Sequence, residues 1–176
     1  MFLTATSCKQ STQRNKQPVS AEVEITKASH FSRCKRYRYH LSHRWAAGSC
    51  CVFVGLNPST ATSEQDDATV RKCAGLAKAW RFSGFELVNL FALRSRDPKA
   101  LQLDPDPVGP RNNWWLQKTL SPDKVVVACW GNGGKLHDRD EALRSQLNNA
   151  YCLGTTISGQ PKHPLYLSTK TTLQKF

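Results

Sequence analysis

Polar residues stand where apolar segments of this sequence end or are interrupted. Asn57 directly follows the apolar run at 50–56, and Asn89 lies inside the run at 85–91. Pro58 keeps Asn57 out of helical geometry and favours a turn there. An amide donates and accepts side by side, which suits the edge of a planar ligand. Two structural alternatives stay open, because Asn-Pro is a common turn dipeptide and a buried amide can also tie loops together.

An acidic pair and a histidine near the chain end are candidates for proton transfer. Asp67 could serve as a general base or orient a water molecule, although Asp66 and Asp67 also suit the first turn of a helix. His163, in KHPLYL, could donate a hydrogen bond to a developing anion. A lone histidine is more often a surface or satisfied side chain, so this structural alternative also stays open.

The formal net charge of +12 predicts a polyanionic partner, such as a nucleic acid or a nucleotide. Arg94 and Arg96 are spaced to reach a phosphate or a carboxylate. The candidate contacts to a nucleic-acid backbone are Arg36, Arg38, Arg44, Arg96 and Lys162. The alternative is that the basic residues only keep the protein in solution.

Several classes of protein have little support in the sequence. There is no Gly-x-Gly-x-x-Gly, no Walker loop and no Ser/His/Asp signature. None of the seven cysteines has Cys-x-x-Cys spacing, so we expect free thiols and neither a metal nor a cofactor. No apolar run approaches the ~20 residues that cross a membrane, and the N-terminus lacks the apolar core of a signal peptide. We therefore expect a cytoplasmic protein that does not bind membranes.

The elements that must position these residues alternate between strands and helices. Strands are expected at 23–26, 37–45, 50–56, 85–91, 124–130 and 151–154, and helices at 66–81, 111–120 and 139–150. Such alternation predicts βαβ units and a mainly parallel sheet, which binds ligands at the carboxyl ends of its strands. Residues 21–167 form the expected single domain, with a basic tail at 1–20 and a shorter tail at 168–176.

The strand at 37–45 is expected to have two different faces. Period-2 alternation places Tyr37, Tyr39, Leu41 and His43 together on a packed face. The opposite face would then carry Arg36, Arg38, His40 and Arg44 and stay cationic.

Long motifs give the chain a resemblance to known proteins. YRYHLSHRW, GLNPSTATSEQDDATVRKC, VNLFALRSRDPKAL, DPVGPRNN, VVVACWGNGG and GQPKHPLYL resemble, in this order, a bacterial and phage domain family of unknown function. That resemblance covers residues 29–167 and suggests an origin in a phage or mobile element. More distantly, the same order resembles the uracil-DNA glycosylase superfamily, in which GLNPS is similar to the water-positioning loop and HPLYL to the loop that supplies a histidine.

The distant resemblance implies a three-layer α/β/α sandwich around a central, mainly parallel four-stranded sheet, with an N-terminal β-hairpin or extension. A flipped base would dock at the strand ends. By position, Asn57 would orient water or substrate, Asn89 would contact the base edge and His163 would stabilise charge on the departing base. Asp67 would join the catalytic set, because Asn57 stands where the most active branch has an acid. The expected substrate-binding residues are Leu56, Pro58, Ser59, Asn89, Arg94, Trp130, Gly131 and Tyr166.

The expected function is that of a DNA-glycosylase-like hydrolase in base excision, acting on a modified or damaged pyrimidine in DNA or in a nucleotide. Two alternatives use the same pocket without the reaction. One is a non-catalytic nucleic-acid or nucleotide-binding protein, and the other is a protein-interaction module. The sequence leaves the oligomeric state open.

Overall fold

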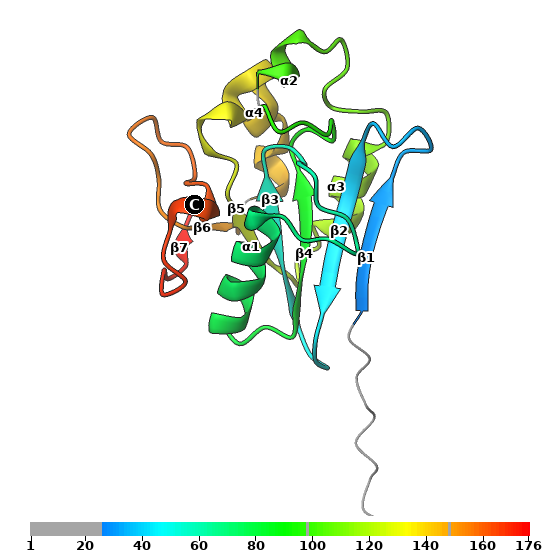
Figure 1. Cartoon of the computed structure of the whole chain (residues 1–176). Helices are drawn as coiled ribbons and strands as arrows, with labels where there is room; N and C mark the ends of the chain where they lie inside the picture. Colours follow the sequence, from blue (N-terminus) through cyan, green and yellow to red (C-terminus); the bar gives the residue numbers. More distant parts are fainter. Residues whose placement is uncertain (1–25, 98, 148) are drawn as a thin grey trace, which may run out of the picture.

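A computed structural model describes residues 26–97, 99–147 and 149–176, and it shows an α/β fold built on one mixed sheet (Figure 1). The sheet has seven strands in the order β1-β2-β4-β3-β5-β6-β7. The strands are β1 Thr26–Phe31, β2 Arg38–Arg44, β3 Cys50–Gly55, β4 Gly84–Asn89, β5 Val125–Ala128, β6 Tyr151–Cys152 and β7 Gln174–Lys175. The neighbours β4, β3, β5 and β6 run parallel, while β1, β2 and β7 are antiparallel to their partners.

Helices cover both faces of this sheet (Figure 1). The α-helices are α1 Ala68–Ala79, α2 Ala100–Leu103, α3 Asn112–Thr119 and α4 Arg139–Leu143. Short 3-10 helices are η1 Gly131–Asp138, η2 Arg144–Gln146 and η3 Pro164–Tyr166. Among the described residues, no helix is long and apolar enough to span a membrane.

The core is divided between the two faces because β3 is buried on both of its sides. Phe53 packs with residues of α1, including Leu76, whereas Val52 and Val54 pack in the cluster that contains Leu116 of α3. A continuous apolar run is what a strand enclosed by helices requires. The sequence CCVFVG meets this requirement, so packing on both faces fixes the position of the carboxyl end of β3.

A bulge in β2 overturns the expected two-faced pattern of this strand. His30 pairs with His40 and Phe31 pairs with Arg38, so Tyr39 is an extra residue between the two pairs. An extra residue reverses the alternation beyond it. Tyr39 consequently packs in the α3-side cluster and Leu41 in the α1-side cluster, not on one common face. The expected cationic face is also wrong, because Arg38 and His40 are both buried.

Other elements differ from the expectations in length and extent. The sheet is larger than four strands, since the β1–β2 hairpin extends one edge and β7 the other. The helix expected at 139–150 ends as α4 at Leu143 and continues only as the 3-10 turn η2. Residues 168–176, expected as a tail, return to the sheet, where β7 pairs with β6. Of the strand expected at 23–26, only Thr26 lies within the described residues. The basic tail expected at 1–20 lies entirely outside them.

Candidate functional site

A cavity of about 420 Å³ lies at the carboxyl ends of β3, β4 and β5, and we call it the strand-end pocket. It collects residues that are far apart in the sequence, from the loop after β3, from β4 and from the turn η3. The sequence-predicted site residues that line it are Leu56, Asn57, Ser59, Asp67, Asn89, Trp130, His163 and Tyr166. Arg38 and Arg96, predicted as backbone contacts, also line it. The predicted catalytic side chains therefore share one cavity.

Asn57 links the two loops that form one wall of this pocket. Its Nδ2 donates to the carbonyl oxygens of Ser95 at 2.9 Å, Pro58 at 3.2 Å and Leu93 at 3.4 Å. The N–H groups of this amide are thus used to hold the loop after β4 against the loop after β3. The Asn-Pro turn thus has a structural role, and the side-chain carbonyl oxygen of Asn57 makes no hydrogen bond to a described residue.

Asn89, at the end of β4, is a buried amide with an unused donor. The residue is 3% exposed, and among the described residues its Nδ2 has no hydrogen-bond partner. Gly55 pairs with Asn89 across the β3–β4 ladder, and a Cβ at Gly55 would lie only 2.7 Å from Asn89 Oδ1. Glycine at the end of β3 therefore makes the room in which the amide sits, and the amide lines the pocket with a donor unsatisfied.

Arg38 brings a buried positive charge into the same pocket. It is 2% exposed, its Nη1 donates to Ala61 O at 2.9 Å, and its Nε has no partner among the described residues. Burial lowers its pKa to about 10, while the charge of Asp67 acts in the opposite direction. The group stays protonated at neutral pH. Arg38, a predicted contact to a nucleic-acid backbone, is buried because the β2 bulge turns its side chain inward.

His163 presents a defined donor. Its Nδ1 accepts a hydrogen bond from Leu165 N at 3.3 Å as it caps η3, so the neutral ring carries its proton on Nε2. Burial lowers the pKa of His163, and the charge of Asp67 raises it by a smaller amount. The neutral imidazole therefore predominates at neutral pH, with Nε2–H as the group available to a ligand.

Asp67 takes the helix-capping role that the sequence left open, and it also lines the strand-end pocket. Its Oδ1 accepts from Val70 N at 2.8 Å and caps α1. The residue also lines the strand-end pocket, where its charge acts on both Arg38 and His163. One carboxylate oxygen is thus committed to the helix, and the other remains for a ligand or a water molecule.

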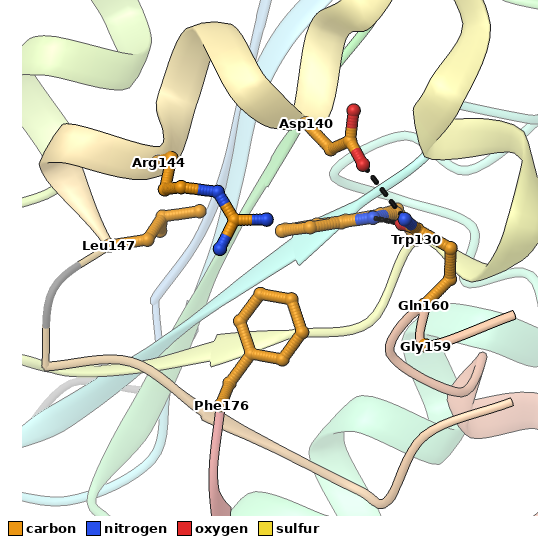
Figure 2. A pocket seen from close by; sticks show the side chains of 7 residues that line it. All are labelled: Trp130, Asp140, Arg144, Leu147, Gly159, Gln160 and Phe176. Atoms are coloured by element: carbon orange, nitrogen blue, oxygen red, sulfur yellow. Dashed lines mark hydrogen bonds between the residues drawn. The ribbon is translucent and has the colours of Figure 1, made fainter.

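Trp130 forms a wall shared by the strand-end pocket and a second cavity of about 370 Å³ (Figure 2). Its Nε1 donates to Gln160 Oε1 at 2.7 Å, and Gln160 Nε2 donates to Asp140 Oδ2 at 2.8 Å. A Cβ at Gly134 would overlap the Trp130 ring, so glycine is required for the close approach of η1. Gly133 and Gly134 of GNGG hence serve packing, whereas Gly131 has a positive φ of 71° and donates from N to Pro161 O at 2.8 Å.

A basic cleft adjoins the strand-end pocket and shares Ser59, Ser95 and Arg96 with it. We define this basic cleft by its cationic residues Lys35, Arg36, Arg94 and Arg96. Arg36 is paired with Asp104, and Arg94 donates to Lys35 O at 2.9 Å while lying over the Phe31 ring. Arg94 therefore lines this cleft and not the pocket in which it was expected.

Besides Arg36 and Arg94, which line the basic cleft, four predicted site residues lie outside the strand-end pocket. Arg44 donates to Ala46 O and Gly48 O and pairs with Gly84, the first residue of β4. It therefore lies at the end of β4 that is opposite to the strand-end pocket. Pro58, Gly131 and Lys162 adjoin pocket residues in the sequence but do not line the cavity. These three residues were predicted because they belong to the GLNPST, VVVACWGNGG and GQPKHPLYL motifs. A motif does not specify the direction in which a side chain points.

Sequence reasoning missed Thr69 and Ser95, which line the strand-end pocket. Thr69 lies in the first turn of α1, two residues after Asp67, and Ser95 lies between the two arginines of LRSR. Their positions beside predicted residues were the available signal. Within the described ranges, no group of three or more His, Cys, Asp and Glu residues could hold a metal ion.

Comparisons with known proteins give one match. Residues 38–165 match a family model described as a protein of unknown function (DUF1643). This range includes every predicted pocket residue except Tyr166. No curated protein and no solved structure matches the chain.

Proposed function

Because the chain belongs to the DUF1643 family, whose function is unknown, we propose a function from the strand-end pocket itself. We propose that this pocket binds the base of a nucleic acid or nucleotide and that the protein hydrolyses the N-glycosidic bond of a modified or damaged pyrimidine. The observation that carries the proposal is that Asn57, Asp67, Asn89 and His163 line one cavity at the carboxyl ends of parallel strands.

The chemistry of the lining supports a base as the ligand. Asn89 offers a buried amide donor, and His163 offers Nε2–H. Directional donors of this kind match the carbonyl oxygens of a pyrimidine edge. Tyr166 is 86% exposed at the pocket, with its ring centroid 6.3 Å from that of His163, so it can stack on a base that enters.

The reaction requires a water molecule and a stabilised leaving group. The water oxygen forms a bond to C1′ of the sugar while a water proton passes to the free carboxylate oxygen of Asp67. The bond between C1′ and the base nitrogen breaks, and its electron pair stays with the base. His163 Nε2–H donates to the carbonyl oxygen on which this negative charge accumulates. The base leaves as an anion that takes a proton from solvent.

The basic cleft supports a substrate with phosphates. It continues from the strand-end pocket through Ser95 and Arg96, and it adds Lys35 and Arg94. A DNA strand with its target base in the pocket would lay a neighbouring phosphate in this cleft. The net charge of +12 would strengthen such binding at low salt.

Base release from DNA tests the proposal. Single- and double-stranded oligonucleotides with a panel of modified pyrimidines, and the matching nucleotides, are incubated with the protein, and free base is measured by mass spectrometry. We expect release from at least one substrate and a loss of ~10²-fold or more in His163→Ala, the size found when one donor to a developing anion is removed. His137→Ala is the matched control, since His137 is exposed on η1 outside the pocket.

The absence of released base from the whole panel would contradict the enzymatic proposal. Binding without release would instead favour the non-catalytic alternative, which has its own support. Asn57 Nδ2 and Asp67 Oδ1 are both committed to the protein, so these two residues have structural reasons to be present.

A further inference from the structure

Two buried donors without partners belong to residues that line the same cavity. Arg38 Nε and Asn89 Nδ2 are each enclosed, each lacks a hydrogen-bond partner among the described residues, and both residues line the strand-end pocket. A buried donor left unpaired costs ~1–3 kcal/mol, and more if it is charged. Two such groups in one place indicate a ligand that supplies the missing acceptors.

Arg38 differs from Arg139, the other arginine that is buried in the described part of the chain. Arg139 donates from Nε to Leu90 O at 2.9 Å and from Nη2 to Asn113 Oδ1, so its guanidinium is satisfied. The Arg38 side chain makes one hydrogen bond to a described residue, from Nη1, and forms no ion pair with any of them. Asp67 is near enough to affect the Arg38 charge but makes no direct contact with it. The Nε of this guanidinium is therefore buried without a hydrogen-bond partner among the described residues.

The β2 bulge at Tyr39 places Arg38 in the pocket. If Tyr39 were an ordinary paired residue of β2, strict alternation would put Arg38, three positions before Leu41, on the opposite face. The bulge reverses this direction, and Arg38 then lines the same cavity as Asn89 of the neighbouring strand β4. β-Bulges are over-represented beside active sites because they re-aim side chains in this way.

We propose that Arg38 and Asn89 form an oxyanion-binding floor in the strand-end pocket, so that its ligand carries a carboxylate or a phosphate group. The inference rests on the proposed function only in placing a nucleobase or nucleotide in this pocket. An oxyanion accepts two hydrogen bonds from one guanidinium edge and has lone pairs left for the Asn89 amide. It also supplies the counter-charge that a buried cation needs.

The oxyanion has two chemical sources, an acidic substituent on the base or the phosphate of a mononucleotide. Binding measurements with matched pairs separate them. One pair is orotate, a carboxylated uracil, against uracil, and the other is uridine monophosphate against uridine. We expect one anionic member to bind at least ~10-fold more tightly than its neutral partner, by isothermal titration calorimetry at constant ionic strength.

Arg38→Gln is expected to abolish this preference, and Arg38→Lys, which keeps the charge without the planar fork, to reduce it. Arg44→Gln is the matched control, because Arg44 lies on the same strand, donates to two carbonyl oxygens and is outside the pocket. Circular dichroism and thermal unfolding verify that each variant folds. Should Arg38→Gln not fold, the Lys variant alone decides the question.

Equal affinity of the anionic and neutral partners for the wild-type protein would overturn the inference. An anion preference that persists in both folded Arg38 variants would overturn it as well, since surface cations would then explain the binding. Its failure is distinct from that of the proposed function. An anion preference without base release from any substrate would support the oxyanion-binding floor and contradict the proposed hydrolysis. Base release without an anion preference would support the hydrolysis and contradict the floor.

Discussion

At the scale of single residues, two buried asparagines differ in how the protein uses their amide donors. Asn112 donates from Nδ2 to Asn89 O at 3.0 Å and to Leu90 O at 2.9 Å, and so holds α3 to the end of β4. The Asn89 amide has no such use for its Nδ2 and faces a cavity instead. Asn89 thus has a donor to spare for a ligand, whereas Asn112 serves the fold.

The charge state of His163 is a second property of a single residue. Because burial lowers its pKa, we expect a proton NMR titration to give a midpoint below the ordinary value of about 6.5. Asp67→Asn removes the charge that raises this pKa, so the midpoint should fall further. As pH drops below 6.5, the unfolded chain takes up this proton before the folded protein does, and His163 then lowers stability. A midpoint at or above 6.5 would show that the ring is not buried as described.

At the scale of elements, the end of β3 determines the shape of the pocket. Gly55→Ala would place a Cβ at 2.7 Å from Asn89 Oδ1, so the amide must move. The glycine has no left-handed φ, and alanine is therefore compatible with the backbone. We expect a loss of ligand affinity of ~10-fold or more with a small change in the free energy of unfolding. Calorimetric binding and urea unfolding of the same variant check this, and unchanged affinity would contradict it.

How well each helix or strand could be predicted depended on how clearly its sequence shows an apolar pattern. The expected helix at 66–81 is confirmed as α1, because its apolar stripe includes Val70, Cys73 and Ala77. The strands β3, β4 and β5 are confirmed within a few residues, since each is a continuous apolar run. The β2 bulge was not predictable from alternation, because the sequence around Tyr39 still alternates and only pairing with β1 shows the extra residue.

At the scale of the whole molecule, the chain end completes the structure beside the site. Phe176 lines the second cavity, with its ring 5.5 Å from Trp130 in an edge-to-face arrangement (Figure 2). Phe176 N donates to Ala150 O, and Trp80 Nε1 donates to Thr171 O at 3.0 Å. Residues 168–176 therefore tie β6 and α1 together at one edge of the fold.

We expect Phe176→Ala to lower the free energy of unfolding by about 1–2 kcal/mol, less than for a fully buried phenylalanine because the residue is 39% exposed. Urea unfolding measures the change. Ile157→Ala is the control and should alter stability by less than ~0.5 kcal/mol, since Ile157 is fully exposed. Equal effects of the two substitutions would contradict the docking of the chain end.

The sequence by itself indicated that Asn57 and Asn89 lie close together. Asn57 follows β3 and Asn89 ends β4, and parallel strands bring their carboxyl ends to the same side of a sheet. The motif that contains His163 was identified from its resemblance, and the structure places this residue in the same cavity.

Only the tertiary structure decided which of their atoms are free to act. Asn57 Nδ2 and Asp67 Oδ1 are used by the protein, while Asn89 Nδ2 and Arg38 Nε are not. Arg38 changed from a surface cation to a buried one through a single extra residue in β2. The reason is physical: residue types carry chemistry and strand direction carries position, but hydrogen-bond satisfaction depends on neighbours that are distant in the sequence.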